Sequence, residues 1–516
     1  MQELEAKYLV TAGGDGAHAL RRLQQSLAWA GYRIQPSGRR RVVDTYLDTA
    51  DQQLRHAGWS YRRRQQNGNV ALALKELNRS RAAVFDREEI EQPLYGDDAD
   101  AAAPPPGAVR DRLTTLLQPD ARLEPLFTLH NLRTRFLLTH PDHPRAAVEL
   151  SYDRARLGAS APVAFIEIEF ELTRGPHELL AGLLDLAALE PELVAARLSK
   201  YQRGLMAAGC PLERRRGPQA RHLDTNSRWL DLAVAHLKSQ FYQLKLYEPY
   251  AWEGVHSEGV HQMRVASRRT RAALGVFRDA LPAAEAARLG DHLRGLHQRL
   301  GAVRDLDVHL AHLADYDQII KPGERPALTG YHAHLVAQHR QARSRLLEAL
   351  DDETYAALVA EFRQLLAAAG RPEHAVEAKV AEAARQAVAP LLAEVRRRGR
   401  AIDAGSPARH LHRLRIRVKR LRYALEFVQD VYGPALTTAL DSLRTLQDQL
   451  GLFQDAIVAR SRLKAYRDAH ELGKRQRKLL KRLIAFEKQR ARQARRRVAK
   501  RWRRADAAVA GLLEML

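Results

Sequence analysis

Polar and apolar residues alternate with a period of two at the start of the chain. In residues 1–10, Glu3, Glu5 and Lys7 occupy every second position, while Leu4 and Tyr8 fall between them. This period predicts a β-strand whose charged side chains share one face. Burying that face without partners would be costly, and a solvated face gives no reason for two acids and a base to line up. The pattern therefore favours a bound ligand or ion.

Several later segments alternate in the same way, and each predicts a strand with one charged face. The charged face is acidic in residues 145–156 and 165–172, and it is basic in residues 59–64, 70–77 and 129–138. The acidic residues are Glu149, Asp153, Glu167, Glu169 and Glu171, and the basic residues are Arg62, Arg64, Lys75, Arg133 and Arg135.

A combination of strands with acidic faces and strands with basic faces suits a site for a metal ion and a polyphosphate. Carboxylates repel phosphate but hold Mg²⁺ or Mn²⁺, which then bridges to phosphate oxygens while Lys and Arg bind the remaining oxygens. Any one of these strands could simply have a solvated polar face. The same alternation in residues 1–10, 59–64, 70–77, 129–138 and 165–172 favours the site.

The pattern changes after a Pro- and Arg-rich stretch at residues 211–222. Before it, residues 176–188 and 194–208 are predicted to be helical. Beyond it, apolar residues recur at spacings of three and four, which is typical of helices, and strand-like alternation disappears. We therefore predict two domains, residues 1–210 and an all-α domain at residues 223–516, joined by a linker at 211–222.

One basic helix occurs twice. Residues 260–271 reappear as residues 411–422, and matching pieces follow at 300–305 and 450–455, so the helical domain contains an internal duplication. Spacings of three and four place the basic residues of each copy in one stripe, which costs an isolated helix roughly a few tenths of a kcal/mol per like-charged pair. A bound polyanion would explain this cost, and two facing stripes would form a positive groove. The stripes are His261, Arg264, Arg268 and Arg271, and His412, Arg415, Lys419 and Arg422.

The net charge of +23 lies in the second part of the chain. Residues 1–210 hold 27 Lys and Arg against 27 Asp and Glu, whereas residues 211–516 hold 57 against 34. An excess of this size predicts a polyanionic partner for the helical domain. The single cysteine, Cys210, the acidic start and the lack of a long apolar run lead us to expect a soluble, cytoplasmic protein without a membrane partner.

The strand motifs resemble the CYTH branch of the triphosphate tunnel metalloenzymes over about residues 1–205. The resemblance rests on Glu3-x-Glu5-x-Lys7, Tyr61-Arg62-x-Arg64, Leu74-Lys75, Arg87-x-Glu89-x-Glu91 and Glu167-x-Glu169-x-Glu171. It implies an eight-stranded antiparallel β-barrel whose lumen binds a triphosphate and a divalent metal, Mg²⁺ or Mn²⁺.

The resemblance also implies roles for single residues. Asp153 is carried over as an acidic metal-site residue, and Lys200 as a late lysine that closes the tunnel on phosphate, although a solvent-exposed lysine at a helix start is equally compatible with the sequence. The metal ligands would be Glu3, Glu5, Asp153, Glu167 and Glu169. The catalytic residues would be Glu3, Glu5, Lys7 and Lys75. The triphosphate ligands would be Lys7, Arg62, Arg64, Lys75, Arg133, Arg135 and Lys200.

The two histidine-led basic helices resemble the CHAD domain over about residues 223–516. That family implies binding of inorganic polyphosphate through a basic surface, with the two stripes as its ligands, and it suggests association with polyphosphate granules. Nucleic acid is the competing partner, but binding to single strands usually adds a series of stacking aromatic residues, and only Tyr423 lies close to the stripes in sequence. The two histidines could instead be buried structural residues.

Together these observations predict an α+β, two-domain protein: a barrel that hydrolyses inorganic triphosphate to diphosphate and phosphate, and a duplicated helical bundle that binds polyphosphate. Other substrates for the barrel are nucleoside triphosphates, thiamine triphosphate, or ATP converted to cyclic AMP. A non-catalytic protein that captures polyphosphate or nucleic acid is the alternative of a different class.

Overall fold

The computed structural model describes residues 2–11, 15–77, 83–95, 100–157, 163–210, 212, 223–371, 378–403 and 405–516. The chain forms two compact units. The first comprises residues 1–213 and 247–259, and the second comprises residues 214–246 and 260–516. Apart from Leu212, the predicted linker at 211–222 lies outside the described residues.

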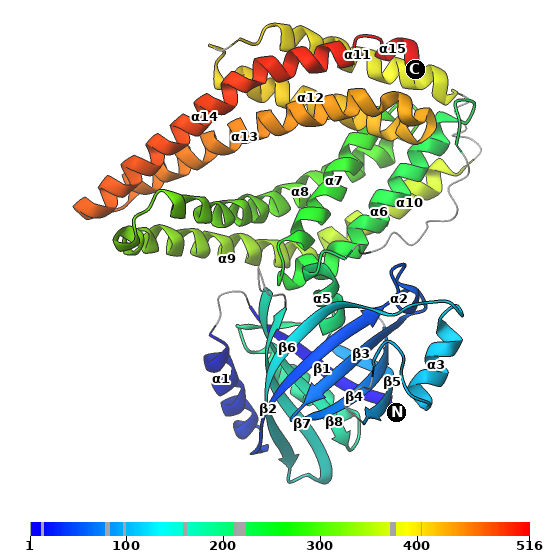
Figure 1. Cartoon of the computed structure of the whole chain (residues 1–516), viewed down its shortest axis with the longest axis vertical. Helices are drawn as coiled ribbons and strands as arrows, with labels where there is room; N and C mark the ends of the chain where they lie inside the picture. The colour runs from blue at the N-terminus through cyan, green and yellow to red at the C-terminus, as the bar shows by residue number, and fades with distance from the viewer. Residues whose placement is uncertain are drawn as a thin grey trace. The chain divides into compact units, whose positions relative to one another are not determined.

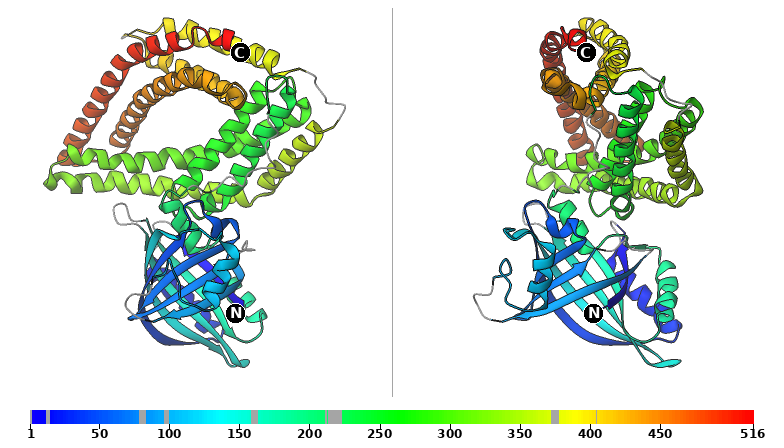
Figure 2. Two further views of the ribbon diagram at one scale, coloured as in Figure 1. Left: turned by 45° about the vertical axis from the view of Figure 1, so that its right-hand side comes forward. Right: turned by 90° about the vertical axis from the view of Figure 1, so that its right-hand side faces the viewer.

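Eight strands of the first unit close into an antiparallel barrel (Figures 1 and 2). Neighbouring strands follow the order β5-β4-β3-β2-β6-β7-β8-β1, and β1 pairs with β5 to complete the ring. The predicted barrel is thereby confirmed. Its strands are β1 (Gln2–Val10), β2 (Arg33–Asp48), β3 (Trp59–Gln66), β4 (Asn69–Glu76), β5 (Val84–Leu94), β6 (Glu124–His140), β7 (His143–Leu157) and β8 (Val163–Arg174).

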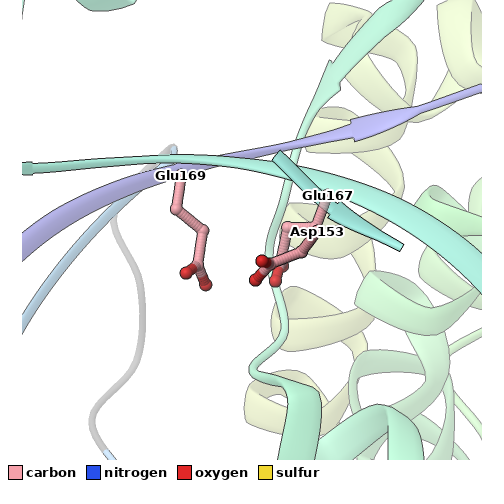
Figure 3. Close-up of side chains that lie close together, drawn as sticks. All are labelled: Asp153, Glu167 and Glu169. Carbon is pink, nitrogen blue, oxygen red and sulfur yellow. The ribbon is translucent and has the colours of Figure 1, made fainter. Parts of the chain in front are cut away.

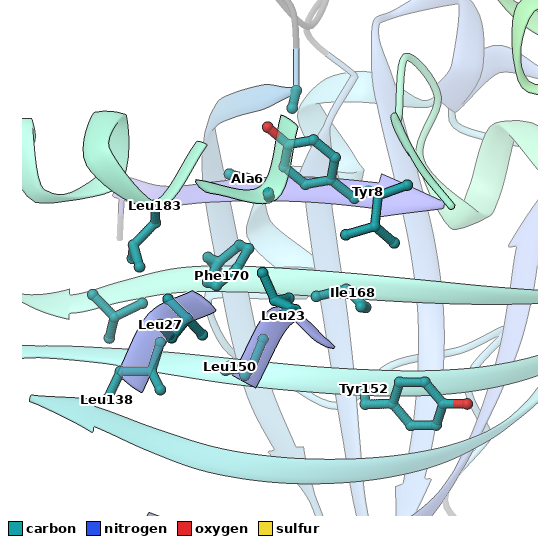
Figure 4. Close-up of a cluster of buried hydrophobic side chains, with 14 of the residues drawn as sticks. Ala6, Tyr8, Leu23, Leu27, Leu138, Leu150, Tyr152, Ile168, Phe170 and Leu183 are labelled. Carbon is teal, nitrogen blue, oxygen red and sulfur yellow. The ribbon is translucent and has the colours of Figure 1, made fainter. Parts of the chain in front are cut away.

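The apolar faces of the strands are covered by helices on the outside of the barrel. Leu150, Ile168 and Phe170 are fully buried in a cluster with Leu27 of α1 (Gly16–Trp29) and Leu183 of α4 (Glu178–Ala188), as Figure 4 shows. Burial of each such side chain contributes about 1.5–3 kcal/mol. The outer shell therefore stabilises the barrel and leaves the opposite strand faces for charged residues.

A second outer cluster lies over β3 and β4. Tyr61, Leu72 and Leu74 pack there against Val109 and Leu113 of α3 (Ala108–Leu116), next to the short helix α2 (Gln53–His56). Because Tyr61 and Leu74 face this cluster, the alternate residues of the same strands face the lumen.

The sequence pattern predicts one helix at residues 194–208, and this prediction is wrong for the first part of the segment. Val194 lies in a short strand, β9 (Leu193–Ala195), where it pairs with Leu9 of β1. The helix α5 (Lys200–Ala207) begins only after Ser199, which caps it in a reciprocal pair of hydrogen bonds with Gln202. This start places Lys200 in the first turn of α5.

The second unit is mostly helical, as predicted. The residues described there form long helices, several of them paired as antiparallel hairpins such as α8 with α9 and α13 with α14 (Figure 1). None of the described helices has the length and apolar character needed to cross a bilayer. The helices are α6 (Trp229–Glu253), α7 (Glu258–Val276), α8 (Ala283–His312), α9 (Thr329–Asp351), α10 (Glu353–Ala369), α11 (Val380–Arg400), α12 (Ala408–Tyr432), α13 (Thr437–Ala469), α14 (Lys474–Ala508) and α15 (Leu512–Met515), with 3-10 turns at Leu313–Gln318, Pro322–Leu328 and Gly433–Leu436.

A buried apolar cluster joins the hairpins of this unit. Leu306 of α8, Tyr331 of α9, Leu463 of α13 and Leu480 of α14 belong to it. The duplicated helices of the sequence correspond to α7 and α12, and the shorter matching pieces lie in α8 and α13. The two basic stripes are thus carried by equivalent helices of the two copies.

Candidate functional site

Three buried carboxylates meet on one wall of the barrel lumen. Asp153 of β7 and Glu167 and Glu169 of β8 are at most 5% exposed, and one oxygen of each lies within 4.8 Å of the others (Figure 3). Asp153 pairs directly with Glu167 in the β7–β8 ladder, which brings the two side chains to the same face. The spacing of two between Glu167 and Glu169 completes the group.

Lys200 lies among these three carboxylates. Its Nζ atom is 2.7 Å from Asp153 Oδ2, 2.5 Å from Glu167 Oε2 and 2.7 Å from Glu169 Oε1. Because α5 begins at Lys200, the helix start places this ammonium group in the lumen rather than in solvent, and the side chain is only 8% exposed.

Two further cations contact the same group. Arg133 of β6 donates to both oxygens of Asp153, at 2.8 and 2.7 Å, and also to Glu169. Lys7 of β1 donates to Glu169 Oε1 at 2.5 Å. Each carboxylate of the cluster therefore faces at least one buried cation.

These charges set the protonation states of the cluster. Burial raises the pKa of Glu169, but Lys200, Lys7 and Arg133 outweigh burial and hold the pKa well below its usual value. Burial also raises the pKa of Asp153, and Lys200 and Arg133 reverse that effect, so the pKa is lowered. For Lys200, burial lowers the pKa, and the three carboxylates raise it more. At neutral pH Asp153 and Glu169 are ionised and Lys200 is protonated.

A second charged group lies where β1 meets β5. Glu5 is 3% exposed and contacts Lys7 at 2.9 Å, Lys75 at 3.5 Å and Arg87. Burial raises the pKa of Glu5, but the cations Lys7, Lys75 and Arg87 lower it to well below the usual range. On the same side, the pKa of Glu89 falls to about 2, because Arg62 and Lys75 outweigh the effect of burial.

Other arginines of the lumen also form ion pairs with carboxylates. Arg64 of β3 makes two hydrogen bonds to Asp44 of β2, at 2.8 and 2.9 Å, and Arg62 donates to Glu89 at 2.9 Å. Arg135 of β6 donates to Glu149 of β7 at 3.0 Å. Among the described lumen residues, the cations are thus matched by carboxylates.

The structure brings most of the predicted lumen residues into one charged network. Lys7, Arg133, Asp153, Glu167, Glu169 and Lys200 share contacts around the carboxylate cluster, whereas Glu5, Arg62 and Lys75 form the neighbouring group. Glu3 lies in β1 opposite Arg87, and its side chain is outside the described residues.

Four residues of the network were not predicted from the sequence: Asp44, Arg87, Glu89 and Arg203. Arg87 and Glu89 belong to the motif Arg87-x-Glu89-x-Glu91, whose spacing of two could have placed them on one face of a strand. Asp44 had no such signal. Arg203 follows Lys200 by three residues, so both lie on one helix face, and it contacts Glu167 at 2.7 Å and Glu253 at 2.7 Å.

The carboxylate cluster fits a divalent metal. Hard oxygen ligands suit Mg²⁺ and Mn²⁺, and the three side chains supply them within one small space. Glu167 Oε2 is buried and accepts no hydrogen bond, although it lies 2.5 Å from Lys200 Nζ. This carboxylate oxygen thus already faces a cation, and its charge suits a divalent metal as well.

The two basic stripes of the second unit meet across α7 and α12. Arg268 of α7 lies over the ring of Tyr423 of α12 at 5.7 Å, and Arg422 lies over the same ring at 4.6 Å. In the part of the chain that the structure describes, Arg268, Arg415 and Lys419 have no carboxylate within ion-pair distance. Cations from the two copies therefore lie close together, and Asp455 interacts with Arg415 from beyond ion-pair distance.

Burial and the proximity of these cations lower the pKa of Lys419. Burial, followed by the charges of Arg268, Arg415, Arg264 and Arg422, lowers the pKa of Lys419 to about 6. The Nε atoms of Arg264, Arg268 and Arg415 are buried without a hydrogen-bond acceptor. Buried donors without an acceptor are costly, and the Nε atoms of several barrel arginines share this state.

Three other members of the stripes have polar or acidic partners. Arg422 contacts Glu426, which also pairs with Arg269 at 2.8 Å, and Arg264 lies 3.6 Å from Asp305. His412 contacts Gln454 at 3.1 Å. The remaining members, His261 and Arg271, lie on α7 at the two ends of its stripe.

Both parts of the chain match known domain families. Residues 1–205 match the model of the CYTH domain, and residues 235–464 match the model of the CHAD domain. An uncharacterised protein of Mycobacterium tuberculosis is 30% identical over 231 residues, which cover 40% of this chain and 40% of that protein. The matched region thus spans less than half the length of these curated relatives.

Two solved structures illustrate the likeness of each part. The CHAD domain from the plant Ricinus communis is 28% identical, with coverage of 58% of this chain and 96% of that one and a TM-score of 0.46. A putative adenylyl cyclase from Hippeastrum, described as having a dominant triphosphatase activity, is 18% identical, with coverage of 41% and 97% and a TM-score of 0.30.

Proposed function

Because this chain joins an N-terminal CYTH domain to a C-terminal CHAD domain, we propose that it hydrolyses inorganic triphosphate with a divalent metal and binds inorganic polyphosphate. The CYTH family includes triphosphatases and metal-dependent enzymes. The observation that carries the proposed reaction is the buried cluster of Asp153, Glu167 and Glu169 in a lumen that is also lined by lysine and arginine.

Asp153, Glu167 and Glu169 would hold Mg²⁺ or Mn²⁺, with Glu3 and Glu5 as candidates for further ligands. When bound, the metal neutralises phosphate oxygens and helps to orient an attacking water. The carboxylates suit this role because their neighbours keep Asp153, Glu169 and Glu5 ionised. A group with such a low pKa is a good ligand and a poor proton acceptor at neutral pH.

The lysines and arginines of the lumen would bind the triphosphate. Four of these cations contact carboxylates in the structure: Lys7, Arg62, Lys75 and Arg133. A phosphate oxygen is also a negatively charged hydrogen-bond acceptor, so it can take the place of a carboxylate oxygen. Arg64, Arg135 and Lys200 extend this set along the barrel. Fixed positive charge at the leaving phosphate stabilises the transition state, and we assign this role to Lys7 and Lys75.

In the second unit, the crowded cations of α7 and α12 support binding of a chain of phosphates. Tyr423 is the aromatic residue beside both stripes, but it is only 3% exposed and arginines lie over its ring. It is therefore not available for stacking on a nucleobase, and this favours polyphosphate over single-stranded nucleic acid as the ligand.

Phosphate release by the full chain tests the proposed reaction. The chain is incubated with tripolyphosphate, ATP or thiamine triphosphate, each with Mg²⁺, with Mn²⁺ or with a chelator, and cyclic AMP is measured in the ATP samples. We expect the highest kcat/KM with tripolyphosphate and no turnover with the chelator. Metal-independent turnover would refute the mechanism, and a preference for ATP with formation of cyclic AMP would replace the assigned reaction.

A further inference from the structure

We propose that Lys200 is an internal counter-ion that occupies the metal position of the barrel and must leave it before a divalent metal binds. Metal binding would thereby release the ammonium group of Lys200 into the lumen, where the triphosphate lies. This inference rests on the proposed function and adds a competition step to it.

The contacts of Lys200 are those of a cation at the centre of a binding site. Its Nζ atom is 2.5–2.7 Å from one oxygen each of Asp153, Glu167 and Glu169. These are the three residues whose oxygens lie within 4.8 Å of one another. Mg²⁺ requires oxygen ligands at about 2.0–2.1 Å, so the ammonium group and the metal would share the same oxygens. Two cations this close repel each other, and occupancy is exclusive.

One of the three contacts is an ion pair without a hydrogen bond. Glu167 Oε2 lies 2.5 Å from Lys200 Nζ but accepts no hydrogen bond, although Glu167 is fully buried. The other oxygen of Glu167 accepts from Arg203 at 2.7 Å. Arg203 therefore fixes the carboxylate, while Oε2 faces the cation of the site.

The backbone around Lys200 is fixed, so the exchange needs only the side chain to move. Ser199 and Gln202 cap the start of α5. Gly204 lies against Phe127 of β6 so closely that an added Cβ would lie 2.0 Å from the ring. The flexible four-carbon stem of a lysine can leave the carboxylates without moving the helix.

Lys75 provides a matched control. It is also a lumen lysine with two carboxylate contacts, but these are to Glu5 and Glu89, each at 3.5 Å, rather than to the three-carboxylate cluster. Lys75→Met and Lys200→Met remove the same charge from the same lumen. Only Lys200→Met removes a competitor from the metal position.

The first experiment measures Mn²⁺ binding by calorimetry with the full chain and no phosphate compound. We expect Lys200→Met to bind Mn²⁺ at least about tenfold more tightly than the unchanged chain, because a site that is mostly occupied by a competitor has a lower apparent affinity. Lys75→Met should change the affinity by less than about threefold, since Lys75 contacts Glu5 and Glu89 and none of the three carboxylates that Lys200 occupies. Equal affinity in all three chains would overturn the inference and leave the proposed function intact.

The second measurement needs no substitution, so it does not depend on whether a variant folds. Amine acylation followed by peptide mass spectrometry reports how reactive each lysine is with and without Mn²⁺. If Mn²⁺ releases Lys200 from the carboxylates, acylation of Lys200 should increase several-fold on addition of Mn²⁺, whereas acylation of Lys75 should stay nearly unchanged. Bound Mn²⁺ without increased acylation of Lys200 would contradict the exchange. If no chain binds Mn²⁺, both the inference and the proposed metal-dependent function fail.

Discussion

The barrel lumen and the basic stripes both gather lysine and arginine, but they balance these charges differently. In the lumen, cations such as Arg133 and Lys200 contact buried carboxylates at 2.7 Å. Between α7 and α12, Arg268, Arg415 and Lys419 have no ion-pair partner among the described residues. A balanced site suits a ligand that brings both signs, a metal with a phosphate compound. An unbalanced site suits a polyanion alone.

Charge reversal in the stripes should have the largest effect. Arg264→Glu with Arg415→Glu should weaken binding of long-chain polyphosphate by about a thousandfold or more, because repulsion replaces two charge-assisted hydrogen bonds. The measurement is titration of the full chain with polyphosphate at several salt concentrations. Binding by the unchanged chain should fall steeply with salt, as it does for other phosphate chains whose counter-ions are released.

The double variant should keep its activity on tripolyphosphate, because the proposed ligands of that reaction lie in the barrel. Competition with DNA and RNA at matched phosphate concentration completes the test. If either nucleic acid displaced polyphosphate readily at physiological salt, the stripes would be a nucleic-acid site.

Neutralising one lumen carboxylate should give the next largest effect. Glu169→Gln should lower kcat for tripolyphosphate by about a hundredfold or more, since the bound metal contributes several kcal/mol to the transition state. Glu5→Gln should act in the same direction. Thermal unfolding should change much less than the rate, because glutamine keeps the size of the side chain and one acceptor oxygen.

The control for this comparison is Glu88→Gln. Glu88 lies on the outer face of β5, where it contacts Arg112 at 3.1 Å with both side chains substantially exposed. Its loss should leave kcat unchanged. Full activity in Glu169→Gln and Glu5→Gln would contradict the assigned metal site.

The smallest predicted effect is a pH dependence confined to the stripes. The pKa of Lys419 is lowered to about 6 in the folded chain, whereas an unfolded lysine has a pKa of about 10.4. Between these values the unfolded chain binds the additional proton, so the free energy of unfolding rises with pH in this window. A bound polyanion favours the ammonium form, and binding should therefore take up a proton.

We expect polyphosphate affinity to increase several-fold from about pH 8 to about pH 6, measured by calorimetry in two buffers that differ in ionisation enthalpy. Lys419→Arg should remove most of this dependence because arginine stays protonated. His297, whose pKa falls to about 4, stays neutral throughout. An unchanged pH profile in Lys419→Arg would assign the proton to another group.

The alternation of the strands was enough to predict much of the barrel. Strand β3 covers residues 59–66, and the charged faces at Arg62, Arg64, Glu167 and Glu169 point into the lumen as their spacing predicts. The closed ring itself came from the resemblance to a known family, because the period of a strand does not specify its neighbours.

Other features depend on contacts between distant residues, and local sequence does not reveal them. Asp44 matters because β2 pairs with β3 and brings it to Arg64. Residues 194–208 have a helical pattern, but Val194 is held in a strand by its pairing with Leu9. The start of α5 at Lys200 follows from that pairing. The meeting of Arg268 with Tyr423 likewise requires two helices that are far apart in sequence.

The placement of the apolar clusters outside the barrel has a consequence for the evolution of this protein. Leu150, Phe170 and Leu183 supply packing in one layer, and the charged lumen residues occupy another. Substitutions in the lumen can therefore alter ligand preference while the outer shell continues to specify the fold. New ligand preferences can be acquired through a few inward-facing positions, without a search for a new hydrophobic core.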